Sequence, residues 1–412
     1  MNAGGGVRVG HPSRTAVTGP LAPYADGFRG DLGGQGYALH SISGQMVLMA
    51  HLSAWLDSQG LPVGGLRAEV VEGYLRVRRG AGHRSGITGR AVAPLLGYLR
   101  GLRVVAQPVG RVPGSAVEVL LEEFRSYLVQ ERGLAPASVH GYLRYSGMFL
   151  TGLAAPLGAT LAELPAGQVT AFLVRQSGLR SSWYAKAMVT ALRSLLRFLH
   201  TAGHIPHPLV GAVPSVPGWK LTALPRSVNA DEVAAVLAGC DRDSAAGRRD
   251  YAILLLLARV GLRAGEVSVI ELDDIDWRAG ELVVRGKGNR VEVLPLPVDV
   301  GEALADYVQY GRPRCVTRGL FVILHAPFTG LGPKGSVFAV VQRACRRAGV
   351  TGFGPPRLRH ALACDLLRHG ASLAEVGQVL RHGDDRTTAI YAKVDQDALH
   401  DLARSCPAGA AL

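Results

Sequence analysis

The chain has 412 residues, of which 48% are hydrophobic and 19% charged, so it can bury the cores of two or three domains. Its 45 lysines and arginines exceed its 32 acids by 13, an excess of positive charge that suits a polyanionic partner such as nucleic acid. The longest apolar run, residues 251–258, is much shorter than the roughly 20 residues that cross a bilayer, which excludes a membrane-spanning protein.

The cysteines and the first residues bear on the compartment. The five cysteines are scattered and odd in number, so no disulfide framework is expected. The first residues lack the charged-then-apolar pattern of a secretory signal. We therefore predict a cytoplasmic protein that has no membrane partner.

Two patterns mark the N-terminal quarter of the chain. Residues 1–40 hold ten glycines and show no helical periodicity, which predicts a flexible leader. From about Ser41 the pattern becomes helical, because apolar side chains recur every three or four positions in residues 46–61 and Gly60 is a typical helix end. Residues 41–108 are therefore expected to form a helical module.

A second helical module is expected at residues 112–204. Within it, EEFRSYLVQERGL at residues 122–134 repeats the apolar pattern of residues 46–61. Further matches along the two modules predict that the first is related to the second and lacks a middle segment of roughly 25 residues. Leucine-rich helices also resemble one another by chance, so unrelated modules are the alternative.

A third domain is expected at residues 225–405, after a linker at residues 205–224 whose prolines forbid a continuing helix. The domain begins with a helix capped by Asn229 or Ser227. Near its end, Gly370 is a helix stop, and the Ser-x-x-Glu spacing that begins at residue 372 is a capping box for the next helix.

The middle of this domain contains the signals that set its fold class. Residues 250–267 have the pattern of a buried helix interrupted at Gly261. Two β-branched runs surround GKGN in residues 281–296, which predicts a β-hairpin. We expect a chain that is mainly α with a small antiparallel β-sheet.

Five side chains of the third domain are candidates for chemistry: Arg263 after the helix break, Lys287 at the hairpin tip, Arg359 at a helix start, and His382 and Tyr391 near the end. Taken singly, each is typical of a solvated surface group. Taken together, the stretches VGLRAGEV, GKGNR, RLRHALACDLLRHG and LRHGDDRTTAIYAK have the order and spacing of the tyrosine recombinase (phage integrase) family. Residues 225–405 resemble this family throughout.

The resemblance implies a site-specific DNA recombinase or integrase that works through a 3′-phosphotyrosine intermediate. By resemblance, Arg263 and Arg359 clamp the scissile phosphate, Lys287 is the hairpin lysine, His382 is the later histidine and Tyr391 is the nucleophile. The alternatives are a catalytically impaired DNA-binding relative and a type IB topoisomerase-like enzyme that only relaxes supercoils.

The resemblance also implies the architecture and the partners. Residues 112–204 look like the core-binding domain and residues 225–405 like the α-rich catalytic domain, and the two would form a clamp around double-stranded DNA. A homo-oligomer is implied, a tetramer when two DNA sites are brought together, with accessory or sister recombinases as further partners. The additional module at 41–108 favours a recombinase of the mobile-element type.

These residue types suit phosphodiester chemistry without a metal or cofactor. Guanidinium groups stay protonated and offer planar, paired donors to phosphate oxygens. A phenol forms a reversible phosphotyrosine bond, and a lysine can give the departing deoxyribose oxygen its proton. Glu266 is expected to orient Arg263 or cap a helix, and Asp273, Asp274 and Asp276 to belong to a turn rather than to a metal site.

One position departs from the family pattern. The family has a histidine three residues before its second arginine, and in this chain Pro356 occupies that place. Proline fits the first turn of a helix, so the fold should survive while a donor is lost. The loss of one transition-state donor typically costs about 100- to 1000-fold in rate. His360 would point about 100° away from Arg359 on a helix, so we do not expect it to substitute.

Overall fold

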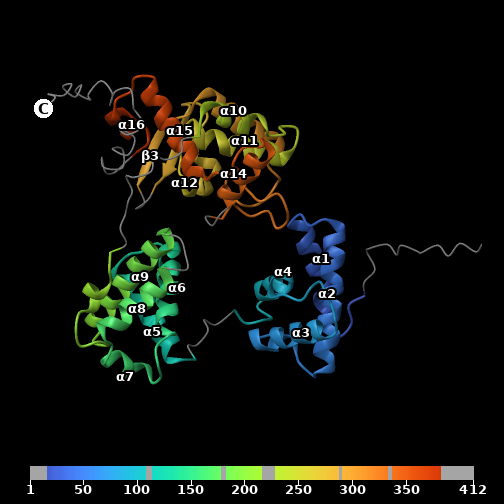
Figure 1. Ribbon diagram of the computed structural model, residues 1–412. Helices are drawn as coiled ribbons and strands as arrows, with labels where there is room; N and C mark the ends of the chain where they lie inside the picture. The colour runs from blue at the N-terminus through green and yellow to red at the C-terminus, as the bar shows by residue number, and fades with distance from the viewer. Residues whose placement is uncertain are drawn as a thin grey trace, which may run out of the picture. The chain divides into compact units, whose positions relative to one another are not determined.

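The computed structural model describes residues 16–107, 114–177, 182–215, 228–286, 290–332 and 336–381. These residues form a mainly helical chain with one three-stranded antiparallel sheet, as predicted (Figure 1). Within the described residues, no helix is both long enough and apolar enough to cross a membrane.

The N-terminal part contains four helices: α1 (Ala25–Gly34), α2 (Leu39–Ser58), α3 (Ala68–Gly80) and α4 (Gly89–Gly101). The prediction of a flexible leader is wrong for residues 16–40, because Leu21, Phe28 and Leu32 are fully buried in the core of this part. The glycines of α1 hid the pattern, since each lowers helix propensity. One of them has a packing role: a Cβ on Gly27 would lie 2.0 Å from the hydroxyl of Tyr98 on α4.

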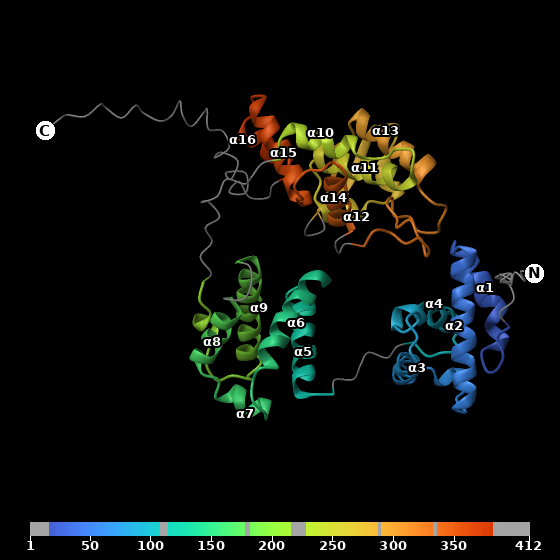
Figure 2. The same cartoon turned by 45° about the vertical axis from the view of Figure 1, so that its right-hand side comes forward.

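Residues 114–215 fold into a helical bundle, part of the compact unit Pro108–Lys220. Its helices are α5 (Ala116–Ser126), α6 (Pro136–Leu150), α7 (Leu157–Ala162), α8 (Ala166–Ser177) and α9 (Ser182–Thr201), of which α5 and α6 lie side by side (Figure 2). The linker prediction is wrong for residues 205–213, because Ile205 and Val213 are each 2% exposed in the bundle core. The helix α9 ends at Thr201, just before Gly203 with φ +77, and the apolar side chains that follow pack back onto the bundle.

The C-terminal part is built around one buried helix, α11 (Ala245–Ala258), whose residues 252–257 are almost fully enclosed. Around it lie α10 (Ala230–Ala238), α12 (Ala264–Val269), α13 (Val298–Asp306), α14 (Ser336–Arg347) and α15 (Pro355–Arg368), and α16 (Leu373–Val379) packs against α15. The sheet has the order β1 (Ile275–Asp276), β2 (Glu281–Arg285) and β3 (Val291–Pro295). The predicted hairpin is confirmed, with Val283 of β2 opposite Val293 of β3.

The predicted helix ends of this part are confirmed. Asn229 caps α10 and forms a capping box with Glu232. Gly261 has φ +65, the left-handed conformation that favours glycine, and it separates α11 from α12. Ser372 and Glu375 form the capping box of α16. These local signals place the ends of the helices on which the candidate site is built.

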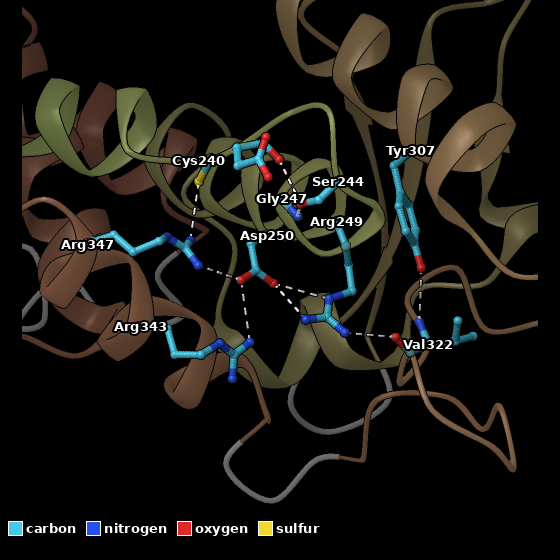
Figure 3. Close-up of polar contacts among 10 residues, drawn as sticks. Cys240, Ser244, Gly247, Arg249, Asp250, Tyr307, Val322, Arg343 and Arg347 are labelled. Carbon is cyan, nitrogen blue, oxygen red and sulfur yellow. Dashed lines mark hydrogen bonds and ion pairs between the residues drawn. The ribbon is translucent and has the colours of Figure 1, made fainter. Parts of the chain in front are cut away.

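A buried ion cluster joins α11 to α14 (Figure 3). Asp250 on α11 is 1% exposed, and its carboxylate accepts hydrogen bonds from Arg249 (Nη2–Oδ1, 2.8 Å) and Arg343 (Nη2–Oδ2, 3.4 Å). Arg347 lies 3.5 Å from the same carboxylate and donates to the sulfur of Cys240 at 3.6 Å. Because a buried charge needs a partner, this cluster fixes α14 against α11.

Candidate functional site

Arg359 is a buried arginine at the point where α15 meets the corner between α11 and α12. The residue is 7% exposed, and its guanidinium donates hydrogen bonds to the carbonyl oxygens of Gly261 and Leu380. Glycine suits position 261, since a Cβ there would lie 3.0 Å from the side chains of Leu362 and Leu380. The carbonyls at the ends of α11 and α16 therefore hold Arg359 in place.

Arg263 is the more accessible of the two predicted arginines, with 43% of its side chain exposed. It precedes α12, and its Nη1 donates to Oε1 of Glu266 at 2.7 Å while its backbone N–H donates to Oε2 at 2.8 Å. The prediction for Glu266 is thus confirmed in both forms, since the carboxylate orients Arg263 and caps α12. Glu266 itself is 3% exposed.

The charge state of Glu266 follows from these contacts. Burial by itself would raise the pKa of this carboxyl. The hydrogen bonds from the backbone and side chain of Arg263, with the charge and hydrogen bond of Arg381, outweigh burial and hold the pKa below its ordinary value. Glu266 is therefore an anion at neutral pH, and its charge is shared between two arginines.

The two predicted arginines converge although 96 positions separate them in the sequence. Arg359 donates to the carbonyl of Leu380, and Arg263 donates to the carbonyl of the next residue, Arg381, at 3.3 Å. Both guanidinium groups thus lie at the end of α16. Paired guanidinium groups at one place can bind two non-bridging oxygens of a phosphate.

Sequence reasoning missed a third arginine in this cluster, Arg381. Its φ is +54, its side chain is 6% exposed, and its Nη2 lies 2.8 Å from Oε2 of Glu266. Its Nη1 lies 3.7 Å from Oε2 of Glu292 on β3. No local pattern could reveal this residue, because an arginine gives no sign of a left-handed backbone and Glu266 is 115 positions away.

Lys287, His382 and Tyr391 lie outside the described residues, so their roles stay predictions. The chain that leads to the first of them is described: the N–H of Gly286 donates to the carbonyl of Arg290 at 2.7 Å and closes the hairpin stem. A Cβ on Gly286 would lie 3.7 Å from Oε1 of Glu266. The stem of the hairpin thus lies beside the arginine cluster.

The helix start near Arg359 has the predicted form. Pro355 and Pro356 occupy the first turn of α15, and Pro356 is exposed. Neither ring can donate a hydrogen bond, so no donor stands where the family has its histidine. Burial, followed by the charges of Arg359 and Arg357, lowers the pKa of His360, which keeps its imidazole neutral at pH 7.

The three predicted turn acids serve the start of the sheet. Asp274 is buried and accepts from Arg285 of β2 at 2.6 Å, while Asp276 accepts from two backbone N–H groups of the β1–β2 turn. Asp273 pairs with Arg318 on the surface. The turn prediction is wrong in detail, because Asp273 and Asp274 lie in a short 3-10 helix (Leu272–Asp274) and Asp276 ends β1, but each acid has a structural partner.

Sequence comparison identifies relatives along most of the chain. Residues 226–397 match the model of the phage integrase family. The protein y4rA of Sinorhizobium fredii, named an integrase/recombinase, is 40% identical over 396 residues, which cover 94% of this chain and 95% of y4rA. The tyrosine recombinase XerD of Mycobacterium tuberculosis is 32% identical over 299 residues, covering 68% of this chain and 95% of XerD.

Solved structures share the fold at low sequence identity. The XerH site-specific recombinase in a post-cleavage complex with a palindromic difH substrate has a TM-score of 0.52 and 17% identity, covering 72% of this chain and 98% of XerH. A lambda integrase dimer bound to a COC′ core site also has a TM-score of 0.52 and 17% identity, covering 85% of this chain and 91% of the integrase.

Proposed function

The chain belongs to the phage integrase family of tyrosine recombinases, enzymes that cleave and join DNA, and we propose that Arg263 and Arg359 hold the scissile phosphate while Tyr391 attacks it. One observation carries this proposal: the two arginines converge on the adjacent carbonyls of residues 380 and 381. A surface role for each arginine alone would not require that convergence.

The arginine pair supplies the positive charge that the reaction needs. Negative charge grows on the non-bridging oxygens as the phosphorus gains a fifth bond. Donors already in place stabilise that charge at no cost of reorganisation. Arg359 is fixed by the carbonyls of Gly261 and Leu380, and Arg263 is fixed by Glu266. The proposal assigns no step to a metal or cofactor.

The bond changes balance with the predicted residues. The phenol oxygen of Tyr391 gives its proton to solvent water and forms a bond to phosphorus, and the bond from phosphorus to the 5′ oxygen breaks. Lys287 gives the 5′ oxygen a proton, leaving a 3′-phosphotyrosyl bond and a free 5′-hydroxyl. A hydroxyl from a partner strand then reverses these steps. His382 hydrogen-bonds the phosphate or orients the phenol.

Pro356 sets the expected speed of the reaction. With no donor at this position, the transition state loses one hydrogen bond, at a typical cost of about 100- to 1000-fold. Both arginines of the site are retained and anchored, so we propose a slow enzyme. The relatives reported above are named as integrases or recombinases, so neither a binding-only protein nor a topoisomerase is favoured.

The proposed substrate is double-stranded DNA, and the protein binds it as a homo-oligomer. XerH and lambda integrase are described in complex with DNA, and this chain shares their fold. We propose a tetramer when two DNA sites are brought together, with accessory or sister recombinases as further partners. Light scattering of the protein with site-bearing DNA should show more than one subunit per duplex. Strictly one subunit per duplex would contradict the tetramer.

Recombination can be tested on a supercoiled plasmid that carries two copies of the DNA flanking this gene. Excision or inversion products should form with the native chain and disappear with Tyr391→Phe. Relaxation of the plasmid without rearranged products would instead indicate the topoisomerase reaction. DNA binding with neither product would indicate the impaired relative.

A further inference from the structure

We propose that Arg381 is a positioning residue of the cleavage reaction, which keeps Arg263 available for phosphate and ties the β2–β3 hairpin to the arginine pair. This inference rests on the proposed function. It assigns to Arg381 no contact with the substrate, because its Nη2 pairs with Glu266 and its Nη1 faces Glu292.

The backbone of Arg381 has an unusual conformation. Its φ of +54 is a left-handed conformation that residues other than glycine, asparagine and aspartate rarely adopt. Such a conformation persists only where its surroundings determine it, and it is often found at functional sites. Here the backbone carbonyl accepts from Arg263 while the side chain turns back to Glu266.

The distribution of charge around Glu266 indicates what the side chain of Arg381 does. Glu266 and Arg381 are 3% and 6% exposed, whereas Arg263 is 43% exposed, so the buried carboxylate has a buried counter-ion of its own. Without Arg381, the buried carboxylate would draw its full compensation from Arg263. The charge that Arg263 can offer to a phosphate would then fall, because a cation that neutralises a carboxylate is a weaker partner for a second anion.

The second contact of Arg381 reaches the hairpin. Its Nη1 lies 3.7 Å from Oε2 of Glu292, which stands opposite Val284 in the β2–β3 ladder. Although Nε and Nη1 are buried, neither makes a hydrogen bond within the described residues. A small movement of the hairpin toward Arg381 would convert the ion pair into a hydrogen bond. Arg381 therefore restrains the hairpin, whose tip carries Lys287, relative to Arg263.

Because the φ of Arg381 is positive, its side chain can be removed without straining the backbone. Arg381→Gly removes the guanidinium but keeps, and even favours, the left-handed backbone. Arg381→Lys keeps a cation that can pair with Glu266. Arg103 is a matched control for the backbone effect, because its φ is +59 and its side chain is exposed, so Arg103→Gly makes the same change away from the cluster.

The measurement is the single-turnover rate of protein–DNA adduct formation, with all DNA bound, on nicked DNA that flanks this gene. Arg381→Gly should slow adduct formation about 10- to 100-fold, the range found for groups that orient metal ligands. Arg381→Lys should recover much of that loss, and millimolar methylguanidinium should partly restore Arg381→Gly. Arg103→Gly should cleave at the native rate. Glu292→Gln should slow cleavage less than Arg381→Gly, since it breaks only the hairpin contact.

Two failures can be told apart. A native chain that forms no adduct on any such DNA would overturn the proposed function and this inference with it. A native chain that forms the adduct, together with an equally fast Arg381→Gly variant, would overturn this inference alone. It would also be overturned if the glycine variant were slow but neither lysine nor methylguanidinium restored any rate, since the loss would then come from folding.

Discussion

Replacing Asp250 by asparagine should destabilise the C-terminal part of the chain strongly. The carboxylate is 1% exposed and faces three arginines, and one of them, Arg249, is itself buried with a side chain 9% exposed. Removing one partner of a buried ion pair typically costs about 3–5 kcal/mol, because the remaining charge is left without compensation. Arg343 and Arg347 are 40% and 35% exposed and can turn to solvent, so most of the cost arises from Arg249.

The expected loss is large enough to measure in the full chain. For a domain of 150–250 residues, about 1 kcal/mol lowers Tm by about 2–4 °C, so Asp250→Asn should lower it by about 6–20 °C. Calorimetry gives the transitions, and hydrogen exchange of α11 peptides identifies the one that belongs to this part. Asp273→Asn is the matched control, because its pair with Arg318 is exposed and such pairs contribute little. If Asp250→Asn lowered Tm no more than Asp273→Asn, the cluster would not hold α11 and α14 together.

Three further predictions concern single residues. Pro356→His should raise the single-turnover cleavage rate, by at most about 100- to 1000-fold, because it returns a donor to the phosphate site; an unchanged rate would show that no donor is missing there. Glu266→Gln should remove a pH-dependent part of the free energy of unfolding. The folded pKa of Glu266 lies below its ordinary value of 4.5, so its contribution is present above that pH and is lost as the pH falls through the folded value. Urea unfolding should thus separate the native and Gln proteins at neutral pH and much less at a pH below the folded pKa of Glu266, and an equal difference at both would contradict the assignment. Ser372→Ala removes the cap of α16 and should lower the free energy of unfolding by about 1 kcal/mol, whereas Ser372→Asn should keep it; equal unfolding midpoints for the two variants would count against the cap.

Features set by neighbouring residues could be predicted from the sequence. The hairpin at residues 281–296 and the caps at Asn229 and Ser372 each depend on a few adjacent positions. The start of α15 at two prolines has the same origin, because proline has its favoured helical place in the first turn.

Features that depend on distant partners escaped prediction. The glycines of α1 look like a flexible segment until Tyr98 of α4 is seen to need the space beside Gly27. Residues 205–213 look like a linker because of their prolines, yet the burial of Ile205 and Val213 attaches them to the bundle. In both stretches, tertiary packing outweighs the local propensity of the chain.

The residues of the candidate site also fall into two groups, those that the sequence could predict and those that it could not. The order of the motifs selected Arg263 and Arg359, and the structure brings these two together. Arg381 could not be selected, because its contacts with Glu266 and Glu292 exist only in the folded chain. Lys287 and Tyr391 stay predictions that chemistry must test.

The most direct test of the central claim is covalent trapping. DNA flanking this gene, nicked so that cleavage cannot be reversed, is incubated with the native chain, with Tyr391→Phe and with Pro356→His, and SDS-resistant adducts are counted and mapped by mass spectrometry. We predict an adduct at Tyr391 with the native chain, none with Tyr391→Phe and a faster one with Pro356→His. An adduct that forms only with Pro356→His, or one that survives Tyr391→Phe, would contradict the proposal that this chain as it stands cleaves DNA with Tyr391.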